Sequence, residues 1–203
     1  MYQAIKMLTQ HLNLHWTFFG AVLFMMALGV ATGAYGASTL PAEQLELLNE
    51  TIGRAFLSIQ SGIDSHALAQ LAVSRNVLII GLVLFLGLTI LGIPIIIALL
   101  FYRTFVLGFT VTFLLQTRSD GILVILLSLL PSSIILIPAL AVAGIIALAF
   151  SFWLIRGRRE GTISLNKALV FYFAVSLACL LMAIVAGLVD AYIAPFLLRF
   201  FLL

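Results

Sequence analysis

Charged side chains are scarce in this chain. Lys and Arg number ten and Asp and Glu seven, so charged residues make up 8% of the 203 positions, against about 25% in ordinary globular domains. This scarcity excludes a large solvated surface. Hydrophobic residues reach 64% and the mean hydropathy is +1.28. The composition therefore predicts an integral membrane protein, with residues 1–203 forming a single polytopic membrane domain.

Cysteine is almost absent as well. The single Cys179 lies in an apolar run, which excludes a disulfide framework within the chain and predicts a small buried side chain. A pI near 9.4 does not indicate nucleic-acid binding. The basic residues stand in short segments between apolar runs, which is the pattern of membrane topology signals.

Long apolar runs are what the sequence has instead. A crossing needs about 20 mostly apolar residues, and the runs predict an all-α bundle of about five transmembrane helices. The third crossing is expected to be broken, because the turn-like Arg118–Gly121 interrupts it; a re-entrant hairpin is the competing interpretation. The first helix is expected to stay uncleaved, because its run exceeds a usual signal-peptide core. The predicted crossings are Trp16–Ala37, Val77–Tyr102, Thr104–Leu130, Ile134–Ile155 and Ala168–Val189.

The distribution of Lys and Arg predicts the orientation. With five crossings and a cytoplasmic N-terminus, the inner segments would hold Lys6, Arg103, Arg156, Arg158, Arg159 and Lys167, whereas the outer segments would hold Arg54, Arg75, Arg118 and Arg199. Basic residues favour the cytoplasmic side. We therefore expect a cytoplasmic loop at about 156–167 and an extracytoplasmic C-terminus in the bacterial cell membrane.

The sizeable polar segment at about 38–76 is predicted to be an outer loop containing an amphipathic helix. Ser38, Thr39 and Pro41 are helix-start residues, and apolar side chains recur at helical spacing. Such a stripe either packs onto the protein's own spans and the headgroup layer or docks an extracytoplasmic partner. The candidate partner-binding residues are Glu43, Leu45, Glu46, Leu48, Glu50, Ile52 and Phe56.

No convincing catalytic or metal-binding constellation is found. His11 and His15 are four residues apart, but no further ligands accompany them. Asp190 is expected at the outer end of the last crossing, which leaves no ionisable residue deep in a span. An intramembrane hydrolase would need a base near Ser132 or Ser133, and none is visible. We expect no enzyme activity, no metal and no cofactor.

Small residues at helical spacing predict close helix contacts. Gly29 and Gly33 form one such step, and Ala183 and Gly187 form another. Packing within the chain is favoured over a homo-oligomer, which stays open. The polar break Pro131, Ser132, Ser133 and Pro138 is interpreted as structural: the prolines would fix the entry to the fourth helix, and a serine would cap its free N–H groups. A functional polar pocket is the alternative.

Several short sequences occur in a familiar order. They are Leu91–Pro94, Gly108–Val111, Leu130–Ser133, Ile137–Ala139, Ile146–Ser151 and Asp190–Pro195. Their order and spacing resemble the stage II sporulation protein M family of bacterial membrane proteins. Broader members of the family carry a His and a Glu where this chain has Ser132 and Leu136, so a His–Glu chemistry is not available here.

The resemblance implies a role in forespore engulfment. Such a protein would be a membrane scaffold for two cell-wall hydrolases, an amidase/endopeptidase and a lytic transglycosylase, bound on the outer face. Its other contact would be the lipid bilayer, and nucleic acid would play no part. A small-solute transporter or channel built around the broken helices 104–138 is the alternative function.

Overall fold

The structure is a computed structural model, and it describes residues 2–60, 65–89, 92–118, 120–156 and 165–202. Every regular element in these ranges is helical. The order is α1 (Tyr2–Ser38), α2 (Ala42–Gln60), α3 (Ser65–Gly87), α4 (Gly92–Thr117), α5 (Gly121–Val124), η1 (Ile125–Leu129), α6 (Leu130–Arg156), α7 (Leu165–Leu188), η2 (Val189–Ile193) and α8 (Ala194–Leu202). The elements η1 and η2 are π-helical.

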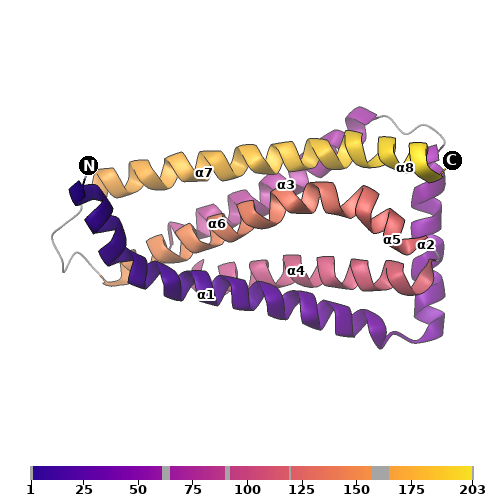
Figure 1. Cartoon of the computed structure of the whole chain (residues 1–203), viewed down its shortest axis with the longest axis horizontal. Coiled ribbons are helices and arrows are strands. Elements are labelled where there is room, and N and C mark those ends of the chain that lie inside the picture. The colour runs from indigo at the N-terminus through magenta and orange to yellow at the C-terminus, as the bar shows by residue number, and fades with distance from the viewer. Residues whose placement is uncertain (1, 61–64, 90–91, 119, 157–164, 203) are drawn as a thin grey trace.

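Five helical segments are long and apolar enough to cross a membrane, which confirms the all-α class and the expected number of crossings. In Figure 1 these segments run side by side along the long axis of the molecule, whereas α2 lies across one end of them. We call this end the α2 end and the opposite one the Thr89 end. The five segments are Phe18–Ser38, Ala69–Gly87, Gly92–Thr117, Gly121–Ile155 and Ala168–Leu197.

The boundaries of the second and third crossings differ from the sequence-based prediction. Helix α3 ends at Gly87, where the N–H of Thr89 donates to the carbonyl of Leu86, and α4 begins at Gly92. The predicted crossing Val77–Tyr102 therefore does not exist, and α4 crosses unbroken as far as Thr117. The polar Arg118–Gly121 stretch joins two crossings rather than breaking one. At the Thr89 end, the hydroxyl of Ser151 donates to the carbonyl of Thr89 at 2.7 Å and holds the turn against α6.

The fourth crossing begins earlier than expected. Helical structure runs from Gly121 through α5 and η1 into α6, so Pro131 lies inside a continuous crossing and not at its entry. The N–H of Leu130 donates five residues back, to Ile125, and the N–H of Ala194 donates likewise to Val189. Each donor directly precedes a proline. A proline ring clashes with the carbonyl four residues earlier, and a widened π turn relieves that clash.

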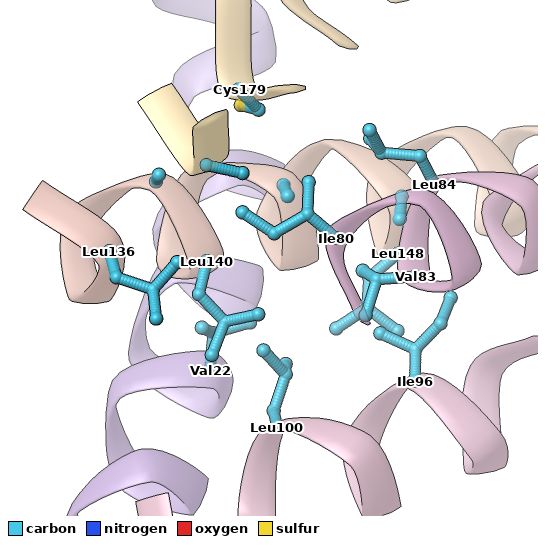
Figure 2. Packing of buried hydrophobic residues seen from close by; sticks show 14 of the residues in the cluster. Val22, Ile80, Val83, Leu84, Ile96, Leu100, Leu136, Leu140, Leu148 and Cys179 are labelled. Atoms are coloured by element: carbon cyan, nitrogen blue, oxygen red, sulfur yellow. The ribbon is translucent and has the colours of Figure 1, made fainter. Parts of the chain in front are cut away.

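The main hydrophobic core draws residues from α1, α3, α4, α6 and α7. Figure 2 shows Val22, Ile80 and Leu100 converging on the α6 residues Leu136 and Leu140. Cys179 belongs to this core and is free and buried, as its apolar surroundings in the sequence predicted. A second, smaller cluster lies nearer the α2 end and consists of Ala37, Phe113, Leu114 and Val124.

Helices α1 and α4 approach closely through glycines. A Cβ added at Gly33 would collide with the carbonyl oxygen of Phe105, and one added at Gly29 would stand 2.6 Å from the carbonyl oxygen of Phe101. Gly108 meets the backbone of Val30 from the other side. Between α3 and α7, Gly187 lies similarly against Val73. These small-residue steps are used between helices of the same chain.

Candidate functional site

The first candidate surface is the outward face of α2. Glu43, Glu46 and Glu50 are exposed, and so is Leu47, whose exposed fraction is 61%. The helix begins at Ala42, directly after Pro41, whose carbonyl accepts from the N–H groups of Gln44 and Leu45. Carboxylates near this start are favoured by the helix dipole. The result is an acidic surface across the α2 end, which we call the acidic face: Glu43, Glu46, Leu47 and Glu50.

The predicted apolar stripe of α2 turns partly inward. Leu45 and Leu48 are half-buried against the smaller cluster around Phe113 and Val124. These two residues therefore contact the protein's own crossings. The backbone of Ile52 and Phe56 continues α2, but their side chains lie outside the described residues. Sequence periodicity alone did not single out Leu47, because it falls between the stripe positions.

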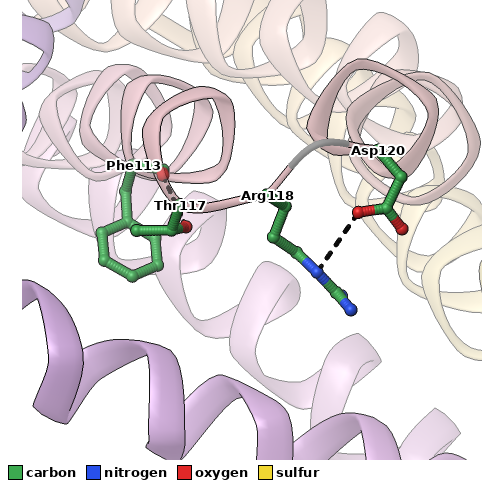
Figure 3. Close-up of polar contacts among 4 residues, drawn as sticks. All are labelled: Phe113, Thr117, Arg118 and Asp120. Atoms are coloured by element: carbon green, nitrogen blue, oxygen red, sulfur yellow. Dashed lines mark hydrogen bonds and ion pairs between the residues drawn. The ribbon is translucent and has the colours of Figure 1, made fainter.

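A short connection at the α2 end joins α4 to α5. Figure 3 shows Arg118 Nε facing Asp120 Oδ1 at 3.4 Å, and the Thr117 hydroxyl turned back toward Phe113. That hydroxyl donates to the Phe113 carbonyl four residues earlier at 2.8 Å, a local bond back to its own helix. The polar groups here are engaged locally, so this connection is a helix terminus and offers no catalytic arrangement.

The polar break in α6 also makes local contacts. The Ser132 hydroxyl donates to the carbonyl of Leu129 at 3.4 Å, so it does not cap a helix N-terminus as expected. The reason is that no N-terminus exists there, because the helix continues from η1. Ser133 is half-buried, and Pro138 is inside α6.

A second candidate site lies inside the bundle. Arg103, expected in a cytoplasmic segment, is the twelfth of the 26 residues of α4. Its Nη2 donates to Oδ1 of Asn76 on α3 at 3.1 Å. Along α4 it falls between Leu100 of the main core and Phe113 of the smaller cluster. The charge of Arg103 therefore lies between two groups of apolar side chains along α4.

Asp190 is the second charged residue of this candidate site. It lies in η2, within the candidate span Ala168–Leu197, and is half-buried. The last crossing was predicted to end at Val189, and helical structure continues past Asp190 to Leu202. The element η2, which carries Asp190, packs against α3, where Arg75 directly precedes Asn76. We call Asn76, Arg103 and Asp190 the polar layer.

The polar layer is incompletely satisfied within the part of the chain that the structure describes. Asn76 is 1% exposed, and its Nδ2 has no hydrogen-bond partner there. The guanidinium of Arg103 makes its single described hydrogen bond to Asn76, and no described carboxylate forms an ion pair with it. Buried donors without partners cost free energy, and more so in lipid than beside water.

Sequence reasoning missed this layer because Arg103 was taken as a loop marker. The sequence nevertheless contains a signal that places Arg103 within a helix. The stretch from Val77 to Thr117 is long enough for two crossings, and Gly87, Gly92 and Pro94 supply turn residues near its middle. Placing the turn there moves Arg103 into a helix, where an intramembrane charge is a functional hypothesis by default.

The predicted histidine pair cannot be placed, because the side chains of His11, His15 and His66 lie outside the described residues. Among the side chains that are described, no group of three or more His, Cys, Asp and Glu residues could hold a metal ion.

Comparison with known proteins gives one informative result. No curated protein and no solved structure matches the chain significantly. A protein-family model described as Stage II sporulation protein M matches residues 21–195. The match covers all five candidate spans except their outermost residues, together with α2 and the polar layer. The chain therefore belongs to the stage II sporulation protein M family.

Proposed function

We propose that this sporulation membrane protein is a scaffold that holds peptidoglycan-degrading enzymes at the membrane during forespore engulfment. Family membership implies a membrane protein of sporulation, and the acidic face carries the proposal further. That face is exposed at one end of the bundle on an ordered helix. Holding an enzyme beside its substrate raises its local concentration, and this role requires no catalytic group on the scaffold.

The proposal needs the α2 end to face the peptidoglycan. With Arg75 and Arg103 inside crossings, five of the other basic residues precede the first span in the sequence or fall between the fourth and fifth spans. The other three fall in the segments on the opposite side of the crossings. This distribution favours a cytoplasmic N-terminus and an extracytoplasmic C-terminus. The first group is Lys6, Arg156, Arg158, Arg159 and Lys167, and the second is Arg54, Arg118 and Arg199.

The test is a pull-down from sporulating cells in mild detergent. The native chain is compared with a variant that combines Glu43→Gln, Glu46→Gln and Leu47→Ser. Because these side chains are exposed, the variant should accumulate normally yet lose the amidase/endopeptidase and the lytic transglycosylase. Gln44→Ala, an exposed change on the same turn, should retain both. Equal recovery of the enzymes with the triple variant, or recovery of neither with the native chain, would remove the support for recruitment.

A small-solute transporter or channel is the second candidate, and the polar layer favours it. Charged side chains inside a helical bundle often mark a solute or ion path. Asp190 of the polar layer lies in a π-helix, and π-helices are frequent at functional sites. Purified protein in liposomes would be tested for flux of small sugars and small anions. Flux that Arg103→Met abolishes would support transport, whereas liposomes no leakier than protein-free controls would reject it.

A further inference from the structure

The polar layer together with the neighbouring Arg75 carries more positive than negative charge. Arg75 and Arg103 contribute two positive charges, and Asp190 contributes one negative charge, which forms no described ion pair with Arg103. All three lie within candidate membrane spans. A net charge at this depth is costly unless an opposite charge approaches.

The polar layer also contains hydrogen-bond donors that have no partner among the described residues. A guanidinium has five N–H groups in a planar fork, and that of Arg103 uses one of them, toward Asn76, among the described residues. The Asn76 amide adds the unpartnered and buried Nδ2. The Arg103 side chain is half-buried, so part of it is open to the surface of the helices.

From this charge and these donors we infer that Arg103, with Arg75 and Asn76, binds an anionic oxygen group of the phosphate type between α3 and α4. An arginine fork matches the paired oxygens of a phosphate. A phosphodiester carries one negative charge, which together with Asp190 brings the local sum to zero. The group would accept from the donors that the protein leaves unused.

Arg75 indicates how the group could enter. Its side chain is exposed on α3, next to the buried Asn76 and within the apolar segment Ala69–Gly87. Exposed surface at this position of a membrane span faces lipid, and long basic side chains there reach toward the headgroup layer. The phosphate can therefore belong to a phospholipid headgroup or to a free phosphate ion. Neither α2 nor any wall enzyme is needed for this site.

The experiment is a titration of the purified full chain in neutral detergent, followed by native mass spectrometry. The probes are phosphatidylglycerol, zwitterionic phosphatidylcholine and sodium phosphate. We expect one phosphatidylglycerol to bind tightly to the native chain and about tenfold or more weakly to Arg103→Met, since charge-assisted hydrogen bonds to phosphate are lost. Arg118→Met removes the same charge at the end of α4 and should bind like the native chain.

Two further variants keep the test decisive if Arg103→Met does not fold. Asp190→Asn removes the competing negative charge, so phosphatidylglycerol should bind several-fold more tightly. Arg103→Lys keeps the charge but not the planar fork and should bind at an intermediate strength. If sodium phosphate binds alone and displaces the lipid, the site is for free phosphate. If the Arg103 and Asp190 variants bind every probe like the native chain, or no probe binds the native chain, the inference is overturned.

Discussion

At the scale of single residues, glycine sets how closely α1 and α4 approach. Gly33 lies directly against the backbone of Phe105, whereas Gly20 on the same helix has no neighbouring heavy atom within 4 Å of an added Cβ. Beside this contact, Phe101, Phe105, Phe109 and Phe113 stack at four-residue spacing along α4. The glycines therefore let α1 approach the helix of stacked phenylalanines more closely than bulkier residues would allow.

These two glycines give a matched pair of variants. Gly33→Ala should lower the free energy of unfolding by about 1–3 kcal/mol, because the new methyl group forces the helices apart. Gly20→Ala should be neutral or stabilising by up to about 1 kcal/mol, because it only improves helix propensity. Thermal unfolding of the purified chains in detergent would measure both. Equal melting temperatures for the two variants would contradict the close α1–α4 contact.

The serines of α6 allow a second test at this scale. Ser132 donates weakly to its own helix, so replacing Ser132 and Ser133 together by Ala should change stability by no more than about 1 kcal/mol. Sporulation should proceed at the native level, as counted from heat-resistant spores. Loss of spores by a stably accumulated double variant would instead indicate that a hydroxyl takes part in chemistry.

At the scale of elements, two adjacent residues of α2 lie on opposite sides of the helix, one facing inward and one facing outward. Leu48 packs against the cluster around Phe113, whereas Leu47 is largely exposed. Leu48→Ser should therefore destabilise the chain by about 1–2 kcal/mol, less than a fully buried leucine would cost. Leu47→Ser should leave stability unchanged and weaken enzyme recovery in the pull-down. Comparable melting temperatures for the two variants would mean that α2 does not rest on the crossings.

Helix type and the number of crossings followed from the sequence, but the end of α3, both ends of α4 and the start of the fourth crossing did not. Apolar runs of sufficient length predicted five crossings, because lipid leaves the backbone few alternatives to a helix. The charge of Arg103 misled the prediction of the crossings, because it was interpreted as marking a segment between two of them. Arg103 can stand inside a helix because Asn76 accepts its hydrogen bond, and no single-residue rule reveals a partner 27 positions away. The π-helix η1 was missed because Pro131 was interpreted as the entry to a helix, although the helix widens there and continues.

At the scale of the whole molecule, the two candidate sites occupy different regions. The acidic face lies across the α2 end, whereas the polar layer lies inside the bundle, between the two hydrophobic clusters along α4. Changes in one site should therefore leave the other intact. We expect Arg103→Met to retain the wall enzymes in the pull-down, provided that it accumulates normally. If Arg103→Met lost both the wall enzymes and phosphate binding, the two sites would be coupled.

The most direct test of this account is cysteine labelling in intact and permeabilised cells, in a Cys179→Ala background. A membrane-impermeant maleimide should label Glu46→Cys from outside, and Ile155→Cys, exposed at the Thr89 end, only after permeabilisation. Thr104→Cys should resist labelling in both cases, because Thr104 is buried beside Arg103 within α4. Labelling of position 104 from the cytoplasmic side, or of position 46 only after permeabilisation, would contradict the account.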